Sequence, residues 1–279
     1  MSYTMPDASP TLSRLAAPTK HRANVLGVGV HAIDLPGAVS VIESAVREGT
    51  KGYVCVTSVH GVMEAQRDPE FRDILNRALL VTPDGMPTVW VGRLQGNSAM
   101  KRVFGPDLML EVCQRSAGTG IRHFLYGGKP GIAGELAQRL QRNFPGIAVV
   151  GTFTPPFRPL EPSEQLALER QLETVLPDIV WVGLSTPKQE RFMAATFRRL
   201  PCKIMVGVGA AFDIHTGHVQ DAPKWIKDVG LQWAHRLCQD PGRLWKRYLV
   251  NNSAFLVAIG LQLAGLRRHA LPPCSHRPS

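Results

Sequence analysis

Cysteine is scarce in this chain, and its residues are widely scattered. The 279 residues include five cysteines, an odd number, and no two of them form a Cys-x-x-Cys pair. Disulfide-stapled secreted domains have even, clustered cysteines, and structural zinc sites have paired ligands. The sequence therefore argues against both classes and indicates a protein of a reducing compartment. The five residues are Cys55, Cys113, Cys202, Cys238 and Cys274.

The chain also lacks a long hydrophobic run. The most apolar late segment, residues 254–266, has 13 residues and contains Gln262. This is too short to cross a bilayer, which takes about 20 apolar residues. Residues 1–22 are polar and rich in Pro, Ser and Thr, without the apolar centre of a secretory signal. We expect them to form a flexible cytoplasmic tail.

Negative charge is in the minority. Lys and Arg number 32 against 22 Asp and Glu, a net charge of +10, and residues 220–279 hold nine basic residues against three acidic ones. Trp225, Trp233 and Trp245 lie among these basic residues. This mixture favours a basic, helical appendage over residues 218–279 that binds an anionic membrane surface. Two alternatives are a solvated helix whose tryptophans pack on the core and, ranked last, a nucleic-acid site, because no recognised binding module accompanies the charge.

Apolar runs alternate with helix-like patterns between residues 23 and 217. Such alternation predicts an α/β domain with a mainly parallel sheet and helices on both of its faces. Pro36 and Pro162 mark helix starts, and Gly146 follows a helix-like pattern as a stop signal. The expected strands are residues 25–30, 53–57, 79–81, 123–126, 147–151, 179–184 and 204–208.

Polar residues follow several of these strands. In open parallel sheets ligands bind beyond the carboxyl ends of the strands, so Asp84 of Pro83-Asp84-Gly85 is a candidate active-site carboxylate. Its other interpretation is a turn residue that bonds nearby backbone amides. Ser58 and His60 close the second strand, and a lone histidine there is more often structural than catalytic.

Glycines follow other strands without forming a dinucleotide fingerprint or a Walker loop. Gly127, Gly128 and Lys129 either present backbone amides to an anion or form a tight turn with a solvated lysine. Gln189 either bonds a sugar or base, or starts a solvated helix. Asp213 is either a helix cap or a ligand contact.

The strand ends form an ordered series of five motifs. They read Pro83-Asp84-Gly85-Met86, Phe124-Leu125-Tyr126-Gly127-Gly128, Val182-Gly183-Leu184-Ser185-Thr186-Pro187-Lys188-Gln189-Glu190, Gly207-Val208-Gly209-Ala210-Ala211-Phe212-Asp213 and Ala222-Pro223-Lys224-Trp225. This series resembles the WecG/TagA/CpsF glycosyltransferases over residues 24–248. The resemblance implies a Rossmann-like domain that transfers a sugar from a UDP donor to a polyprenyl-diphosphate-linked acceptor with inversion. It also implies that Asp84 is the catalytic base and that Gln189 lies in the same pocket.

The residue types suit that chemistry. Inversion needs one base, opposite the leaving UDP, to take the proton of the acceptor hydroxyl, and a carboxylate serves. Many sugar-nucleotide enzymes hold a metal with an Asp-x-Asp motif, and this chain has none. We therefore expect no metal and no cofactor, with the diphosphate stabilised by helix amino termini and basic side chains.

The sequence departs from the family pattern in two places. Residues 56–60 do not contain the expected Thr-x-Asn, and Asp221 and Asp228 stand where relatives often carry arginines. The expected diphosphate contacts therefore shift to Lys224, Lys227, Arg236 or Arg243. The expected substrate contacts are Thr57, Ser58, His60, Gly85, Gly127, Gly128, Lys129, Gln189, Asp213, Lys224, Lys227 and Arg236.

Two classes of function follow from these observations. The first is an inverting, metal-independent transferase on the inner face of the bacterial plasma membrane, in exopolysaccharide or cell-surface polysaccharide synthesis. The Pro-Asp-Gly-Met-Pro form resembles the exopolysaccharide branch and favours a hexose such as glucose over N-acetylmannosamine. The second is a non-catalytic partner that binds a nucleotide sugar or lipid-linked glycan. Nucleic acid is not an expected partner, and oligomerisation is left open.

Overall fold

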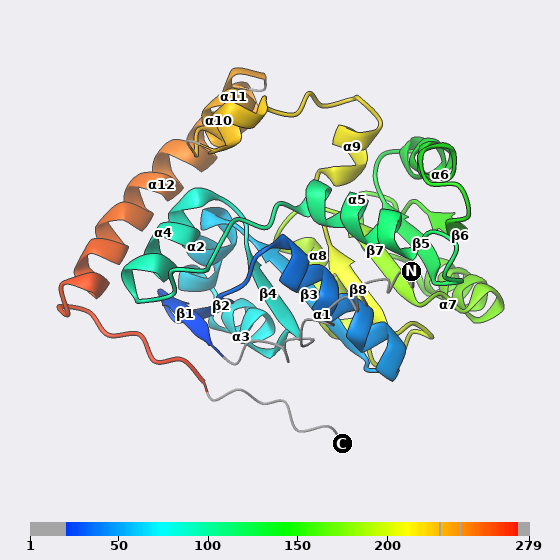
Figure 1. Cartoon of the computed structure of the whole chain (residues 1–279), viewed down its shortest axis with the longest axis horizontal. Helices are drawn as coiled ribbons and strands as arrows, with labels where there is room; N and C mark the ends of the chain where they lie inside the picture. The colour runs from blue at the N-terminus through cyan, green and yellow to red at the C-terminus, as the bar shows by residue number, and fades with distance from the viewer. Residues whose placement is uncertain (1–20, 229, 240, 273–279) are drawn as a thin grey trace, which may run out of the picture.

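A single parallel sheet forms the centre of the protein. The computed structural model describes residues 21–228, 230–239 and 241–272 (Figure 1). Six of the seven predicted strands form this sheet, in the order β4-β3-β8-β7-β5-β6, and all neighbouring pairs are parallel. The predicted α/β class is thereby confirmed. The strands are β3 Gly52–Thr57, β4 Leu80–Pro83, β5 Arg122–Gly127, β6 Ala148–Phe153, β7 Ile179–Gly183 and β8 Ile204–Gly207.

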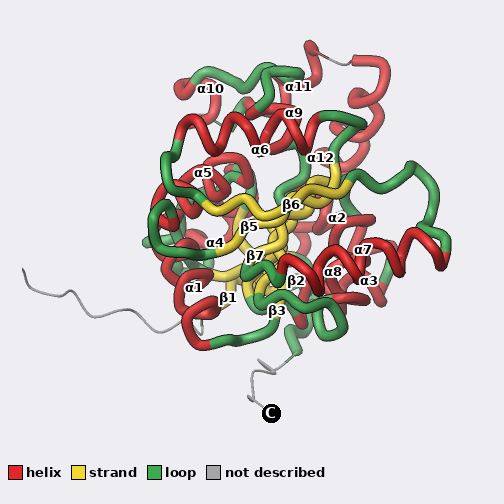
Figure 2. Tube along the Cα trace, turned by 90° about the vertical axis from the view of Figure 1, so that its right-hand side faces the viewer, coloured by secondary structure: helices red, strands yellow, loops and turns green. Residues whose placement is uncertain are grey.

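Helices cover both faces of this sheet. The helices of the described residues, not all of which touch the sheet, are α1 Leu35–Glu48, α2 Val59–Arg67, α3 Pro69–Arg77, α4 Met86–Leu94, α5 Gly105–Ser116, α6 Ile132–Asn143, α7 Pro162–Val175, α8 Lys188–Thr196, α9 Ala211–His215, α10 Lys224–Asp228, α11 Gln232–Gln239 and α12 Pro241–Leu263. One apolar core joins the sheet to α1, α5 and α6, and the other joins it to α2, α3, α7 and α8. Figure 2 shows the strands between these two helical layers.

Helix α1 shows how local sequence sets an element's ends. The side chain of Asp34 caps its first turn by accepting a hydrogen bond from the amide of Gly37, and Pro36 lies within that turn. Gly49 ends the helix at a φ of 70°, a left-handed conformation that glycine adopts at little cost. Between these ends Val39, Ile42 and Val46 recur at helical spacing and are buried, which fixes α1 on the sheet.

The strand predicted over residues 25–30 is wrong. The chain instead forms an antiparallel hairpin of β1 Arg22–Val25 and β2 Val28–His31, outside the main sheet. Leu26 and Gly27 make the turn with φ values of 53° and 81°. A two-residue hairpin turn of this hand usually carries Asn-Gly or Asp-Gly, so Leu-Gly within an apolar run gave no turn signal.

Long-range bonds hold that turn. The amide of Leu26 donates to Oε1 of Gln262 on α12, and its carbonyl accepts from Nε2 of Gln66 on α2. Phe255 and Ile259 of α12 are buried in the core that contains the hairpin. The C-terminal segment is therefore helical, as predicted, and its last helix packs on α2 and the N-terminal hairpin (Figure 1). The predicted tail lies outside the described residues up to residue 20.

A series of hydrogen-bonded polar side chains crosses the core between β5, β7 and α5. Trp181 donates from Nε1 to Nδ1 of His123 at 3.0 Å, and Nε2 of His123 lies 2.8 Å from the hydroxyl of Ser116. That hydroxyl donates to the carbonyl of Cys113, so His123 must donate to it from Nε2. Both ring nitrogens are thus satisfied only in the neutral imidazole.

Acid should destabilise the fold through this histidine. Burial lowers the pKa of His123 from 6.5 to about 4, although the charge of Asp178 opposes the shift. The unfolded chain therefore binds more protons between pH 6.5 and 4, and stability falls as the pH drops through that window. The expected loss is roughly 3 kcal/mol. Urea unfolding at a series of pH values measures the free energy of unfolding. If that free energy fell as steeply with decreasing pH in His123→Asn as in the wild type, the assignment to His123 would be contradicted.

Candidate functional site

A large cavity opens at the carboxyl ends of the sheet strands. Its volume is about 1360 Å³, and its lining includes the residue that follows each of five strands: Ser58, Asp84, Gly128, Leu184 and Val208. This edge is where open parallel sheets bind ligands. Most of the sequence-predicted site residues meet here: Ser58, His60, Asp84, Gly85, Gly128, Lys129, Gln189, Asp213, Lys227 and Arg236.

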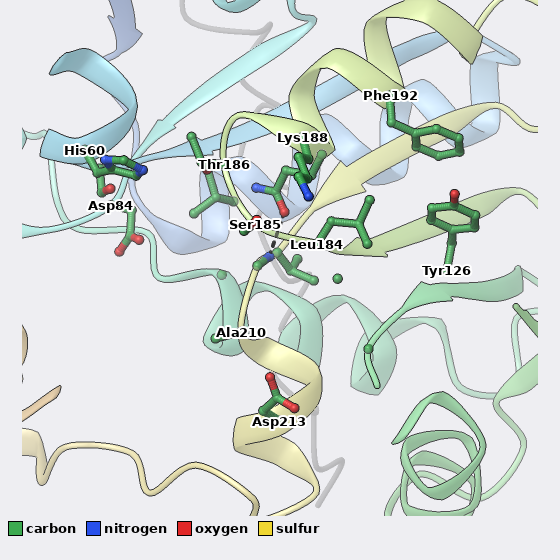
Figure 3. Close-up of a pocket in the computed structure, with 18 of the residues that line it drawn as sticks. His60, Asp84, Tyr126, Leu184, Ser185, Thr186, Lys188, Phe192, Ala210 and Asp213 are labelled. Atoms are coloured by element: carbon green, nitrogen blue, oxygen red, sulfur yellow. Dashed lines mark hydrogen bonds between the residues drawn. The ribbon is translucent and has the colours of Figure 1, made fainter. Parts of the chain in front are cut away.

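Asp84 is held by backbone bonds on both sides. Its amide donates to the carbonyl of Thr57 at 3.0 Å, and the carbonyl of Pro83 accepts from the amide of Val103 at 2.8 Å. Gly85 then turns the chain at a φ of 95°, and α4 starts at the next residue. The Asp84 carboxylate is partly exposed and lines the cavity beside His60 (Figure 3). The sequence placed this carboxylate in the crevice, and the geometry supports that interpretation.

Arg102 faces Asp84 and was not predicted. Its Nε lies 3.8 Å from Oδ1 of Asp84, and its guanidinium lies 4.4 Å from the centre of the Phe104 ring. A second nitrogen donates to the side chain of Gln232 on α11. Within the described residues, the buried Nε has no hydrogen-bond acceptor. A buried donor of this kind marks a position where a ligand oxygen would be stabilised.

Gln189 is inside the wall of the cavity. Its Oε1 accepts from the amide of Gly209 at 3.1 Å, and its Nε2 donates to Oε1 of Glu190 at 2.9 Å. The same oxygen of Glu190 accepts from the hydroxyl of Thr186 at 2.9 Å. Gln189 is 2% exposed, so it is not the solvated start of a helix. Its amide braces the loops after β7 and β8 against each other.

Gly127 and Gly128 have different surroundings. Gly127 pairs with Gly183 of β7 at a φ of 130°, and a Cβ there would lie 2.5 Å from the Gly183 carbonyl oxygen. The pairing of β5 with β7 therefore requires glycine at position 127, and Gly127 does not line the cavity. Gly128 and Lys129 do line the cavity, at the loop that leads to α6.

Among the remaining strand-end residues, Thr57 lies outside the cavity lining, whereas Asp213 and His60 belong to it. Thr57 is buried and contributes its carbonyl to Asp84, with its hydroxyl 3.5 Å from the carbonyl of Cys55. Asp213 is not a helix cap, because the cap position of α9 is Ala210, and it lines the cavity (Figure 3). His60 also lines the cavity and bonds Asn251 of α12 at 3.1 Å.

Two basic residues of the C-terminal segment, Lys227 and Arg236, line the cavity, and Lys227 is already paired with carboxylates. Lys227 forms ion pairs with Asp221 and, at 4.0 Å, with Asp107, and its ammonium lies 5.3 Å from the centre of the Phe104 ring. Arg236 lines the cavity. The side chains of Lys224 and Arg243 lie outside the described part of the structure.

No group of three His, Cys, Asp or Glu side chains is gathered for a metal ion among residues 21–228, 230–239 and 241–272. The site that these residues do show is a carboxylate facing an arginine in the strand-end cavity. Several lysines and arginines lie around the same cavity.

Known proteins match most of the chain. Residues 23–269 match the family described as "Glycosyl transferase WecG/TagA/CpsF family". An N-acetylglucosaminyldiphosphoundecaprenol N-acetyl-beta-D-mannosaminyltransferase of Bacillus spizizenii is 30% identical over 217 residues, which are 77% of this chain and 82% of that protein. A protein of the same name from Bacillus subtilis is 29% identical over 185 residues, or 66% of this chain and 70% of that one.

Proposed function

The chain belongs to the WecG/TagA/CpsF family of glycosyltransferases, and we propose that it transfers a sugar from a UDP-sugar to a polyprenyl-diphosphate-linked saccharide with inversion. The observation that carries this proposal is the Asp84 carboxylate, which lies at the strand-end cavity 3.8 Å from Arg102. Both Bacillus relatives are named for an acceptor in which a sugar is joined to undecaprenol through a diphosphate. We place the reaction in exopolysaccharide or cell-surface polysaccharide synthesis.

Asp84 is the proposed general base. An acceptor hydroxyl beside it loses its proton as its oxygen attacks the anomeric carbon, and the bond to UDP breaks on the opposite face. One carboxylate is sufficient for this single displacement. The loop that carries Asp84 is tied to β3 and to Val103 by backbone bonds, so the carboxylate keeps its position without help from the substrate.

The leaving diphosphate needs positive charge, and the cavity lining supplies it. Lys129, Lys188 and Arg236 line the cavity, and none of them forms an ion pair within the described residues. Lys227 is already paired with Asp221. We propose that the first three contact the diphosphate electrostatically and that the reaction proceeds without a metal ion.

Arg102→Gln should lower kcat by roughly a hundredfold, because a buried cationic donor at the reacting centre is lost. Lys101→Gln is the matched control, since the neighbouring Lys101 is exposed and pairs with Asp34 on the surface. Turnover should be measured for both variants alongside thermal unfolding. A variant Arg102→Gln that kept wild-type kcat would remove Arg102 from the mechanism.

The donor and the reaction are tested together by UDP release. Purified protein is assayed with an undecaprenyl-diphosphate-linked N-acetylglucosamine acceptor, in the presence of chelator, against UDP-glucose, UDP-N-acetylmannosamine, UDP-galactose and UDP-glucuronate. The relatives' name favours N-acetylmannosamine, whereas the Pro-Asp-Gly-Met-Pro motif favours a hexose. Release from one donor supports the proposal and identifies the sugar. Binding of a donor without release from any of them would instead support a non-catalytic binding partner.

We also propose that α12 lies on the inner face of the plasma membrane. Trp245, Leu249, Leu256 and Leu263 fall on one face of this helix and are each about half exposed or more. Arg267 and Arg268 follow the helix and are exposed. Among the described residues, no helix has the length and apolar character to cross a membrane. An exposed apolar face with neighbouring basic residues is typical of helices that lie in the interface.

The double variant Leu249→Glu and Leu256→Glu should bind vesicles of phosphatidylglycerol at least about tenfold more weakly than the wild type, because it places charge on the apolar face. Leu166→Glu is the control, since Leu166 is a comparably exposed leucine on α7. Sedimentation with vesicles measures both. Equal binding by the double variant and the control would exclude α12 as the membrane-binding surface.

A further inference from the structure

The contact between α2 and α12 contains a buried amide. Asn251 of α12 is 5% exposed and bonds two residues of α2. Nη2 of Arg67 donates to its Oδ1 at 2.7 Å, and its Nδ2 lies 3.1 Å from Nδ1 of His60. Because a guanidinium can only donate, the oxygen of this amide must face Arg67. The amide nitrogen, a donor, must then face His60.

This arrangement fixes the tautomer of His60. An amide nitrogen that donates to Nδ1 requires a lone pair there, so the neutral ring carries its proton on Nε2. Glu64 does not reverse the assignment. Its Oε1 lies 3.7 Å from Nδ1 of His60, beyond hydrogen-bond distance, and accepts from Nη1 of Arg67 at 3.0 Å.

His60 is also part of the reaction cavity. It is the second residue of α2, just after β3, and it lines the cavity together with Asp84 and Asn252 of α12. Figure 3 shows the His60 ring and Asp84 at the same end of the cavity, away from Tyr126 and Phe192. This end is bounded by α12, the helix that we place on the membrane, and a lipid-linked acceptor would enter from the membrane.

We infer that His60 binds the acceptor, donating a hydrogen bond from Nε2 to an oxygen of the lipid-linked saccharide, and that Asn251 is the positioning residue that keeps the proton on Nε2. The inference rests on the proposed function for the identity of the ligand. The tautomer itself follows from the contacts with Arg67 and Asn251 alone.

The tautomer is measured first. Long-range proton–nitrogen correlations of the imidazole rings, with His60 assigned by comparison with His60→Gln, should show the proton on Nε2 in the wild type. Asn251→Asp replaces the donating amide with an acceptor of the same shape, so His60 should gain a proton on Nδ1. A wild-type ring protonated on Nδ1, or an unchanged ring in Asn251→Asp, would overturn the inference.

Kinetics then test the ligand. Asn251→Asp should raise the acceptor KM at least tenfold and change the donor KM less than twofold. His60→Gln, whose amide nitrogen falls near Nε2, should retain more activity than His60→Asn, whose amide falls near Nδ1. Gln141→Glu adds the same charge on the exposed surface of α6 and should leave both constants unchanged.

The possible failures are distinct. A wild-type protein that turns over no donor would contradict the proposed function, while the nitrogen spectra would still report the tautomer. An active enzyme in which Asn251→Asp alters the donor KM, or neither KM, would contradict the role of His60 alone.

Discussion

Asp84→Asn should lower kcat for sugar transfer by about a thousandfold, because the amide retains the shape of the carboxylate but cannot accept the proton of the acceptor hydroxyl. The surrounding backbone should not move, since the amide of Asp84 and the carbonyl of Pro83 make the bonds that hold this loop. Donor affinity should change little. Rapid-mixing assays of UDP release measure kcat, and calorimetric titration with UDP measures binding.

The matched replacement is Asp213→Asn. Asp213 also lines the cavity, but it comes from α9, on a different element from Asp84 (Figure 3). A residue that only contacts the substrate should affect KM more than kcat. If Asp213→Asn abolished turnover while Asp84→Asn kept more than a tenth of it, the base would be Asp213, and our assignment of Asp84 would be wrong.

Gly127→Ala should destabilise the fold by roughly 4 kcal/mol or more, enough to prevent folding in many proteins of this size. The new methyl group would lie 2.5 Å from the carbonyl oxygen of Gly183, in a backbone conformation with a φ of 130°. The two glycines are paired in neighbouring central strands, so neither can move away without breaking the sheet. Urea unfolding measures the loss, as does the yield of folded protein.

Gly134→Ala provides the control. Gly134 lies in the first turn of α6, and a Cβ there would meet no other described atom within 4 Å. The same substitution should therefore stabilise the protein by about 0.5 kcal/mol, because alanine favours a helix more than glycine does. A Gly127→Ala protein as stable as Gly134→Ala would show that the end of β5 is more adaptable than its geometry indicates.

The strands of the sheet were readable from sequence because each combines an apolar run with polar or glycine residues at its end. Asp84 could be placed in the same way, since strand ends of one parallel sheet converge on one edge. The hairpin at residues 22–31 was not readable. Its turn at Leu26 depends on side chains of Gln66 and Gln262, which are 40 and 236 residues away in the sequence.

Arg102 was missed for a related reason. It lies in an irregular segment between α4 and α5 that has no periodicity, and only tertiary contacts with Asp84 and Gln232 reveal its position. The sequence identified Gln189 as a pocket residue, but it could not show that both ends of its amide are used within the protein. The partners of a polar side chain depend on packing, which composition and spacing do not encode.

The contact between the hairpin of β1 and β2 and residues 262–272 has a consequence for synthesis on the ribosome. The hairpin is among the first parts of the described chain to emerge, yet Gln262, His269 and Pro272 supply bonds to its residues. Phe255 and Ile259 cover the same core. Its apolar residues Val25 and Val28 are therefore not fully covered until α12 has been translated. The cavity is completed equally late, because Trp233, Arg236 and Asn252 belong to its lining. A nascent chain therefore has no complete cavity before Asn252 has left the ribosome.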